Sequence, residues 1–321
     1  MTQHQHAITA AGPQPLVSIV LATYNGAVHL EQQLESVFLQ SYENIEVIAV
    51  DDASADGTVE ILKAFASRHP NMKWTVNEHN LGYIRAFEKG CRMASGVFIS
   101  LCDQDDYWHP DKVRKLVDVI GANAMAYCDS LICDKDLNST GRKISDVANL
   151  RNFDDCLQQA VFCRIYGHAS LVSRSFCESA MSFLPVIPHD WWLSFNAAFS
   201  GGIVYLDEPL IRYRQHAGNL FGAATGGSSR SRRQRKKVSK KEEREKIRVR
   251  IEAFYQRCPA ELTATKKILG ALCRSYRNFY PWNGLWRVAL FLRHKDRLLV
   301  VKKRSSVRKI LFCFKMIWMI K

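Results

Sequence analysis

Apolar residues in the first 120 positions follow two alternating patterns. Short continuous apolar runs rich in β-branched residues are typical of strands buried in a parallel sheet. Between these runs, apolar residues recur every three or four positions, as at Leu30, Leu34 and Val37, which predicts amphipathic helices. The alternation repeats about four times and predicts an α/β fold with a mostly parallel central sheet covered on both faces. The expected strands are 16–22, 45–50, 74–76 and 97–101.

The pattern changes beyond residue 120. The stretch 129–165 has weak periodicity, and we interpret it as an insertion over a functional site. Further strands are expected at 169–173 and 203–205, followed by an extended segment at 210–218, and a helix is expected to open at His189. From Glu242 onward the distribution of charges favours helices.

Charge divides the 321 residues unevenly. The formal net charge is +14, but 28 of the 45 Lys and Arg residues and only 6 of the 31 Asp and Glu residues lie after position 228. A mildly acidic globular part therefore precedes a strongly basic C-terminal part. We divide the chain into a flexible N-terminus at 1–15, a main domain at 16–221, a basic flexible linker at 222–245 and a basic helical region at 246–321.

The basic C-terminal region has more than one interpretation. Its cations and the apolar residues of 298–321 suit a helix lying on an anionic membrane surface. The alternative is a pair of helices packed on the main domain with solvated charges. A nucleic-acid-binding role is a weaker alternative, because we recognise no such motif, so no nucleic-acid partner is expected. The apolar stretch 310–320 is too short to span a bilayer, the start of the chain does not resemble a signal peptide, and a cytoplasmic location is expected.

Polar residues follow three predicted strands at their carboxyl ends. They are Thr23-Tyr24-Asn25, Asp51-Asp52 and the acidic run 103–106. Ligands of parallel α/β sheets bind beyond this edge, and crowded carboxylates favour a cation such as Mg²⁺ or Mn²⁺. The alternative for each segment is an ordinary polar turn. The sequence has neither a GxGxxG at the first strand end nor a P-loop lysine, which disfavours dinucleotide oxidoreductases and P-loop NTPases.

Three later segments also carry candidate chemistry. Arg85 follows a glycine turn and could meet a phosphate, or it could be a solvated helix charge. Segment 189–192 places the Asp190 carboxylate beside two tryptophans, which suits a general base and a sugar-binding face; the alternative is a helix-start aspartate with core tryptophans. Arg214 and His216 could meet phosphate and metal, or form a surface basic turn.

Taken in order, these motifs resemble the family 2 nucleotide-sugar glycosyltransferases of the GT-A fold. The resemblance covers about residues 1–220, and six motifs in the family's order make it specific. It lacks the QxxRW motif of processive synthases, while DQDDYW and YRQH resemble rhamnosyltransferases and other O-antigen or capsule transferases. The motifs are SIVLATYNG (18–26), VDDASADGT (50–58), NLGYIRAFEKGCRMASG (80–96), CDQDDYWHPDK (102–112), HDWW (189–192) and YRQHAGN (213–219).

The resemblance implies a role for each group of polar residues. Donor-binding residues would be Thr23, Tyr24, Asn25, Asp51, Asp52, Arg85, Asp103 and Arg214; of these, Thr23 and Tyr24 would border the base, and Asp52, with Asp51 behind it, would contact the base or ribose. Asp103 and Asp105 would form the DXD motif that holds Mg²⁺ or Mn²⁺ at the donor diphosphate, with His216 nearby. Asp190 would be the catalytic base, and Trp191 and Trp192 would contact the acceptor.

The implied function is an inverting hexosyl- or rhamnosyltransferase. It would move a sugar from a nucleoside diphosphate sugar to a saccharide or polyprenyl-linked acceptor in bacterial O-antigen, lipopolysaccharide or capsule synthesis. We expect it at the inner face of the plasma membrane as a peripheral protein, because of the basic C-terminal region. A sugar nucleotidyltransferase is the alternative, since it shares the sheet and the metal carboxylates but releases pyrophosphate.

Overall fold

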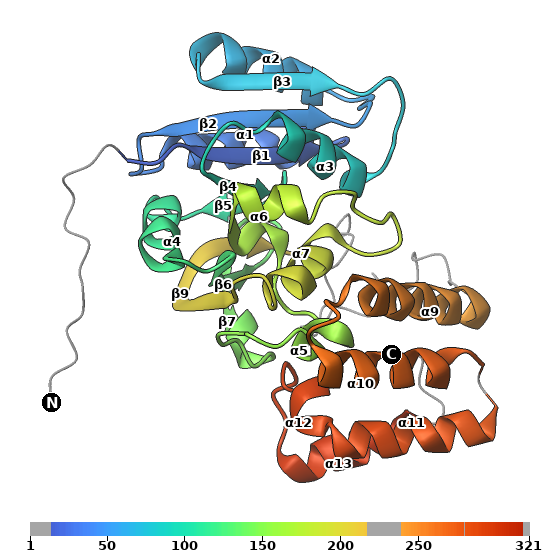
Figure 1. Ribbon diagram of the computed structural model, residues 1–321. Coiled ribbons are helices and arrows are strands. Elements are labelled where there is room, and N and C mark those ends of the chain that lie inside the picture. The colour runs from blue at the N-terminus through green and yellow to red at the C-terminus, as the bar shows by residue number, and fades with distance from the viewer. Residues whose placement is uncertain (1–13, 217–238, 279, 317–321) are drawn as a thin grey trace, which may run out of the picture.

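The computed structural model describes residues 14–216, 239–278 and 280–316 (Figure 1). Within these residues a single mixed sheet has the strand order β3-β2-β1-β4-β8-β6-β9-β5, and β7 pairs with β6. Its first half is parallel and alternates with helices, as the sequence predicted. This half consists of β1 (Val17–Thr23), α1 (Ala27–Phe38), β2 (Ile45–Asp51), α2 (Thr58–Arg68), β3 (Met72–Val76), α3 (Tyr83–Met93) and β4 (Phe98–Cys102).

Helices cover both faces of this half. Val17, Ile19 and Leu21 of β1 share one core cluster with α1 and α2. Val20, between them, points to the opposite cluster, which contains α3. Successive side chains of a strand alternate between the faces of a sheet, so a continuous apolar run serves both cores at once. The predicted α/β fold with two covered faces is confirmed.

The second half of the sheet is mixed. β8 runs antiparallel to both β4 and β6, whereas β6 and β9 are parallel. The elements are β5 (Tyr107–Trp108), α4 (Lys112–Ile120), β6 (Met125–Cys133), β7 (Ser139–Lys143), η1 (Ile144–Asp146), α5 (Leu157–Ala160), η2 (Gly167–Ala169), β8 (Ser170–Ser173), α6 (Arg174–Ser179), α7 (His189–Ala197) and β9 (Ile203–Arg214).

Strand β6 corrects the predicted insertion at 129–165. Residues 129–133 form the end of a buried strand between β8 and β9. The sequence signal was weak because Asp129 and Ser130, both fully or almost fully buried, interrupt the apolar run. Strand β9 likewise joins the two segments predicted at 203–205 and 210–218, and its register against β6 shifts on either side of Asp129.

The C-terminal region is helical, as predicted, and it packs on the main domain. Phe254 of α9 stacks on Phe195 of α7 with 4.0 Å between ring centroids, and both belong to one core cluster. Helix α9 begins at Lys240 with Ser239 as its cap, so the helices start before the predicted boundary at 246. Residues 1–13 of the predicted flexible N-terminus (1–15) and residues 222–238 of the predicted linker (222–245) lie outside the described residues. The helices are α9 (Lys240–Arg257), α10 (Thr263–Tyr276), α11 (Pro281–Arg293), α12 (Lys295–Leu298) and α13 (Ser306–Lys315).

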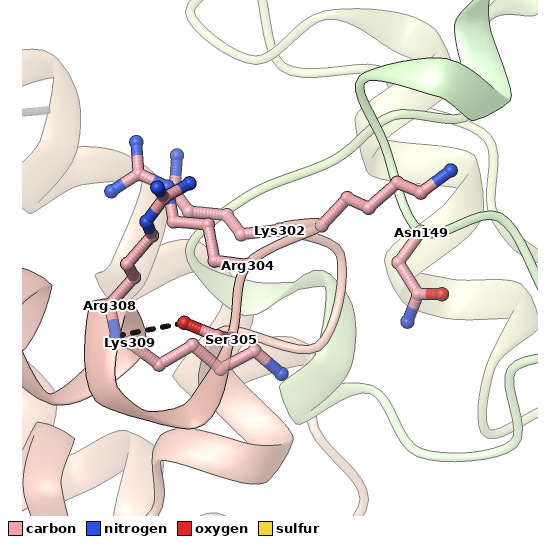
Figure 2. A pocket seen from close by; sticks show the side chains of 7 residues that line it. Asn149, Lys302, Arg304, Ser305, Arg308 and Lys309 are labelled. Carbon is pink, nitrogen blue, oxygen red and sulfur yellow. Dashed lines mark hydrogen bonds between the residues drawn. The ribbon is translucent and has the colours of Figure 1, made fainter.

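The last three helices lie at the end of the molecule opposite β3 and α2 (Figure 1). A cavity of about 350 Å³ opens beside the loop that leads into α13, and lysines and arginines dominate its lining (Figure 2). Among the described residues, no helix combines the length and the apolar character needed to cross a membrane.

Candidate active site

A side-chain clasp joins the ends of β1 and β4. Gln104, in the acidic run after β4, accepts a hydrogen bond from the backbone N–H of Tyr24 at 2.8 Å and donates one to its carbonyl at 3.1 Å. A Cβ atom on Gly26 would lie 2.3 Å from the Gln104 Oε1 atom, so glycine leaves room for the clasp. Tyr24 itself is 48% exposed, and its predicted stacking against a nucleobase stays a prediction.

Asp51 holds the loop after β2. Its buried carboxylate accepts hydrogen bonds from the Thr23 hydroxyl at 2.8 Å and from the backbone and hydroxyl of Ser54. Asn25 adopts a left-handed backbone conformation (φ 47°), which asparagine tolerates better than most residues, and its side-chain oxygen accepts from the Ala55 N–H. These residues shape the edge of the site, and their predicted ligand contacts stay predictions.

Asp52 connects β2 to the turn before α3. Its carboxylate accepts hydrogen bonds from Asn77 Nδ2 at 2.8 Å, Leu81 N at 2.9 Å and Gly82 N at 2.7 Å. The side chain is 2% exposed, so the structure gives it a positioning role. Arg85, in the first turn of α3, forms an ion pair with Glu88 at 2.5 Å. The predicted contacts of Asp52 and Arg85 with the donor remain predictions.

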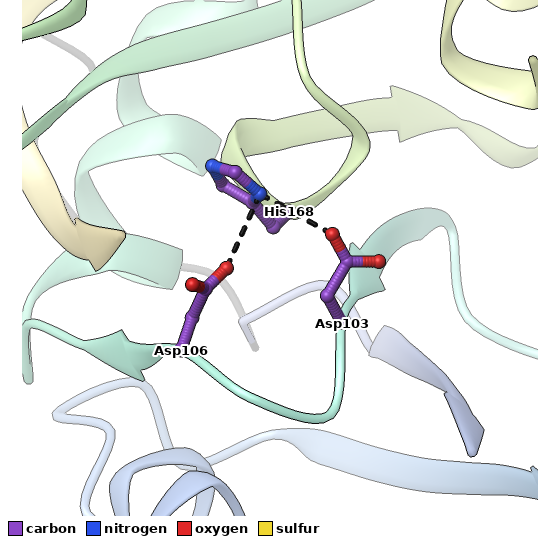
Figure 3. Close-up of side chains that lie close together, drawn as sticks. All are labelled: Asp103, Asp106 and His168. Atoms are coloured by element: carbon purple, nitrogen blue, oxygen red, sulfur yellow. Dashed lines mark hydrogen bonds and ion pairs between the residues drawn. The ribbon is translucent and has the colours of Figure 1, made fainter. Parts of the chain in front are cut away.

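The acidic run converges on a histidine that the sequence analysis missed. His168 Nδ1 lies 3.3 Å from Asp103 Oδ2 and 3.2 Å from Asp106 Oδ2 (Figure 3). One potential ligand atom from each of the three residues lies within 4.8 Å of the others. His168 sits in η2, immediately before β8, and a polar residue preceding a buried apolar run was its only sequence signal.

The carboxylates of this cluster are stabilised by a positive charge nearby. Burial, with help from Asp105 and Asp103, raises the pKa of Asp106 to about 8. Burial alone would lower the pKa of His168, but Asp106 and Asp103 raise it overall. The same imidazole lowers the pKa of Asp103 against the opposing effect of burial. A protonated His168 or a bound cation would each compensate these carboxylates.

The potential ligand atoms of Asp103, Asp106 and His168 suit a divalent cation. Oδ2 of Asp106 is buried and has no hydrogen-bond partner among the described residues, although it lies near His168. Buried charges are normally paired or bound to metal, and two carboxylates with an imidazole are suitable ligands for Mn²⁺ or Mg²⁺. The predicted set was Asp103, Asp105 and His216. Asp105 and His216 pair beside this cluster, at 2.8 Å between Oδ2 and Nε2, and the predicted set stays a prediction.

Arg214 fixes the acidic run from the end of β9. Its guanidinium donates to the carbonyls of Asp105 and Lys135, both at 2.7 Å, and to Gln32 Oε1 at 2.8 Å. Its backbone N–H donates to Asp106 Oδ1 at 3.0 Å. Because the side chain is 2% exposed, Arg214 acts here as a positioning residue, and its predicted contact with the diphosphate stays a prediction.

Asp190 lies in the first turn of α7, near the acidic run. Burial raises the pKa of its carboxyl, and the negative charge of Asp103 acts in the same direction. Tyr83 comes directly after the turn that Asp52 binds. Burial and the negative charges of Asp190 and Asp103 raise the pKa of its hydroxyl group, and its ring contacts the His189 ring. Asp190, which the sequence places far from Asp103, therefore lies within electrostatic range of it.

The two tryptophans after Asp190 differ in environment. Trp192 is 6% exposed, donates its indole N–H to the Ala180 carbonyl at 2.8 Å and packs on Phe254, as a core residue does. Trp191 is half-buried beneath the guanidinium of Arg250, 3.9 Å from its ring centroid. The acceptor contacts predicted for this pair stay predictions.

Comparisons with known proteins agree with this architecture. Residues 18–179 match the family model described as glycosyl transferase family 2. An uncharacterized glycosyltransferase of Haemophilus influenzae is 26% identical over 213 residues, which cover 63% of this chain and 66% of that protein. The putative glycosyltransferase EpsH of Bacillus subtilis is 29% identical over 222 residues, covering 64% and 62%. This chain thus spans slightly less than two thirds of these relatives' own length.

Solved structures share the fold at low identity. Staphylococcus aureus TarS in complex with UDP-GlcNAc gives a TM-score of 0.58 at 13% identity, covering 95% of this chain and 82% of that one. The mannosyltransferase PcManGT of Pyrobaculum calidifontis, in complex with GDP-Man and Mn²⁺, gives 0.51 at 16% identity, covering 94% and 79%. The fold is thus that of the GT-A glycosyltransferases. Its motifs, its sheet and the matched family model agree that this chain belongs to glycosyl transferase family 2.

Proposed function

We propose that this protein transfers a sugar from a nucleoside diphosphate sugar to a hydroxyl group of a saccharide or polyprenyl-linked acceptor, with inversion at the anomeric carbon. The observation that carries the proposal is that Asp190 accepts a hydrogen bond from the backbone of Gly167, the residue before His168 of the cluster with Asp103 and Asp106, and lies within electrostatic range of Asp103. The cluster suits a diphosphate and its cation, and Asp190 suits a hydroxyl group that must lose a proton.

The donor end of the site is assigned to the acidic run. Asp103, Asp106 and His168 would hold Mg²⁺ or Mn²⁺, which when bound would offset the charge that develops on the departing diphosphate. The Gln104 clasp and Arg214 keep the run in place from β1 and β9, so its carboxylates need little reorganisation when a donor binds. Two relatives by fold were solved with UDP-GlcNAc or GDP-Man, which supports a nucleotide-sugar donor.

The acceptor end of the site is assigned to Asp190. A carboxyl with a raised pKa is a stronger base than an ordinary aspartate once it is ionised. In the proposed reaction Asp190 takes the proton of the acceptor hydroxyl, whose oxygen bonds to the anomeric carbon as the bond to the diphosphate oxygen breaks. One displacement of this kind inverts the configuration.

We assign the reaction to bacterial surface-polysaccharide synthesis of the O-antigen or capsule type, and we place it at the inner face of the plasma membrane. The name of one similar protein supports the polysaccharide class: the putative teichuronic acid biosynthesis glycosyltransferase TuaG of Bacillus subtilis, 32% identical over 114 residues that cover 36% of this chain and 45% of that protein. The sequence favours a hexosyl or rhamnosyl unit.

A donor screen tests the proposal. The purified protein is incubated with Mn²⁺ or Mg²⁺ and a panel that includes UDP-GlcNAc, GDP-mannose and a nucleoside diphosphate rhamnose, with release of nucleoside diphosphate as the readout. We expect metal-dependent turnover of one donor. Release of pyrophosphate from a nucleoside triphosphate and a sugar phosphate would instead identify a nucleotidyltransferase. The anomeric configuration of the product, read by nuclear magnetic resonance, tests inversion.

A further inference from the structure

Helix α13 has two apolar faces. Phe312, Cys313 and Met316 are buried against the protein. On the opposite side, apolar residues at helical spacing of three and four face the solvent: Val307, Ile310, Leu311 and Phe314, which are 66, 37, 59 and 51% exposed. A helix that only packs on a domain needs one such face, so the second indicates contact with something else.

The neighbouring helix α11 repeats this arrangement. Gly284, Val288 and Phe291 are buried, whereas Trp282, Leu285 and Trp286 are 80, 52 and 38% exposed on the opposite side. Tryptophan favours the boundary between water and lipid because its ring is apolar and its N–H is polar. Two adjacent helices thus each offer an apolar stripe to the solvent.

Positively charged side chains lie beside the exposed apolar residues of α13. The loop that leads into this helix, together with its first turns, carries five cations that line the cavity with Asn149 and Ser305 (Figure 2). No ion pair links any of the five to a carboxylate of the described residues. Burial lowers the pKa of Lys302 to about 8, and the positive charges of Arg164 and Arg304 act in the same direction. We call this site the basic cavity; its cations are Lys302, Lys303, Arg304, Arg308 and Lys309.

The charges on this surface indicate the kind of partner that it binds. Between residues 280 and 316 the only acidic residue is Asp296, and it pairs with Lys295. A surface that carries apolar side chains and unpaired cations together complements an anionic bilayer, which offers phosphates above hydrocarbon. We propose that α11, α13 and the basic cavity form the surface by which this protein docks on an anionic lipid membrane. The exposed apolar side chains enter the interface, and the cations bind lipid phosphates.

This inference rests on the proposed membrane-linked acceptor, but its test does not require sugar transfer. The full-length protein is sedimented with vesicles of phosphatidylcholine alone or mixed with phosphatidylglycerol. We expect binding to the anionic vesicles that weakens as ionic strength rises. Asp190→Asn is expected to bind vesicles like the wild type, so loss of catalysis and loss of docking are separable.

Matched variants locate the surface. Arg308→Gln is expected to lower the partition coefficient about fivefold, whereas Lys63→Gln, on the exposed side of α2, leaves it unchanged. Leu311→Ser is expected to lower it about tenfold. Its control is Leu39→Ser, because Leu39 and Leu311 are similarly exposed, at 60 and 59%. All of these positions are exposed, so folding should be preserved.

Several outcomes would overturn the inference. One is equal vesicle binding by Leu311→Ser and the wild type, and another is equal binding to neutral and anionic vesicles. A third is a wild-type dimer that Leu311→Ser converts to monomer with unchanged vesicle binding, since the stripe would then join two copies of the chain. A fourth is saturable binding of inorganic pyrophosphate in the basic cavity without vesicle binding, which would indicate a soluble ligand.

Discussion

Asp190 combines two properties that a single substitution can separate: its raised pKa and its ability to accept a proton. Asp190→Asn preserves shape and polarity but cannot act as a base. We expect kcat to fall about 10²- to 10⁴-fold while donor affinity stays near the wild-type value. Steady-state kinetics and calorimetry measure the two quantities, and Asp118→Asn, exposed on α4, is the control. Near-normal turnover in Asp190→Asn would contradict the assignment.

The pH dependence of activity follows from the same group. A base works when deprotonated, so kcat/KM should decline as pH falls through the pKa of Asp190. Because burial raises that pKa above the ordinary aspartate value of 3.8, the decline should begin at a higher pH than for a solvated aspartate. A pH–rate profile with Asp118→Asn alongside the wild type checks this expectation.

Glu46 on β2 makes a second, structural prediction. Burial by itself would raise the pKa of Glu46, but hydrogen bonds from Ser18, Ser95 and Lys73 lower it to about 2. A depressed folded-state pKa stabilises the fold above the unfolded-state value, and the contribution is lost as pH falls from about 4.5 towards 2. Glu46→Gln should therefore cost about 2 kcal/mol at neutral pH and much less near pH 2. Urea unfolding at both pH values measures the difference; an equal loss at both would contradict it.

Individual site residues were predictable only where a local motif carries them. Asp103 and Asp190 stand in recognisable segments of the sequence, and the structure brings them into one neighbourhood. His168 has no such segment, because its meaning comes from Asp103 and Asp106, more than 60 positions earlier. Arg214 was assigned to the ligand from its motif, and its hydrogen bonds to Asp105 and Gln32 add a positioning role that spacing alone does not reveal.

At the scale of elements, the loop after β4 presents two candidate ligand sets to a metal ion. We favour Asp103, Asp106 and His168 because their ligand atoms converge and one of them is buried without a hydrogen bond among the described residues. Asp106→Asn should therefore weaken Mn²⁺-dependent donor binding at least tenfold, and Asp105→Asn should weaken it less. Calorimetry with and without Mn²⁺ compares them. The reverse order would favour the set with Asp105 and His216.

The elements themselves were predictable in proportion to the clarity of their periodicity. The first four strands each appear close to their expected positions, and β1, β2 and β4 carry the long apolar runs that make them predictable. β6 was missed because Asp129 and Ser130 break its run, and its burial depends on neighbours far along the chain. The antiparallel direction of β8 was not predictable either, because strand pairing is set by contacts that no local pattern encodes.

At the scale of the whole molecule, the C-terminal helices share the core of the main domain. Phe254 is fully buried among Phe195 and Trp192. Phe254→Ala should cost about 3–5 kcal/mol of unfolding free energy, and unfolding should remain a single transition. Leu39→Ala, at an exposed position, should change stability by less than about 0.5 kcal/mol. A separate early transition of the helices alone would contradict a shared core.

The stacking of Phe254 on α7 also constrains how this protein can be recombined with its relatives. Helix α7 carries Asp190 on its first turn and Phe195 on its buried side, so the proposed base and the packing surface belong to the same nine residues. A chimera with the C-terminal half of a relative would pack different side chains against α7 and would therefore displace the proposed base. Chimeras designed to change where the protein is located in the cell should therefore exchange α7 and α9 together.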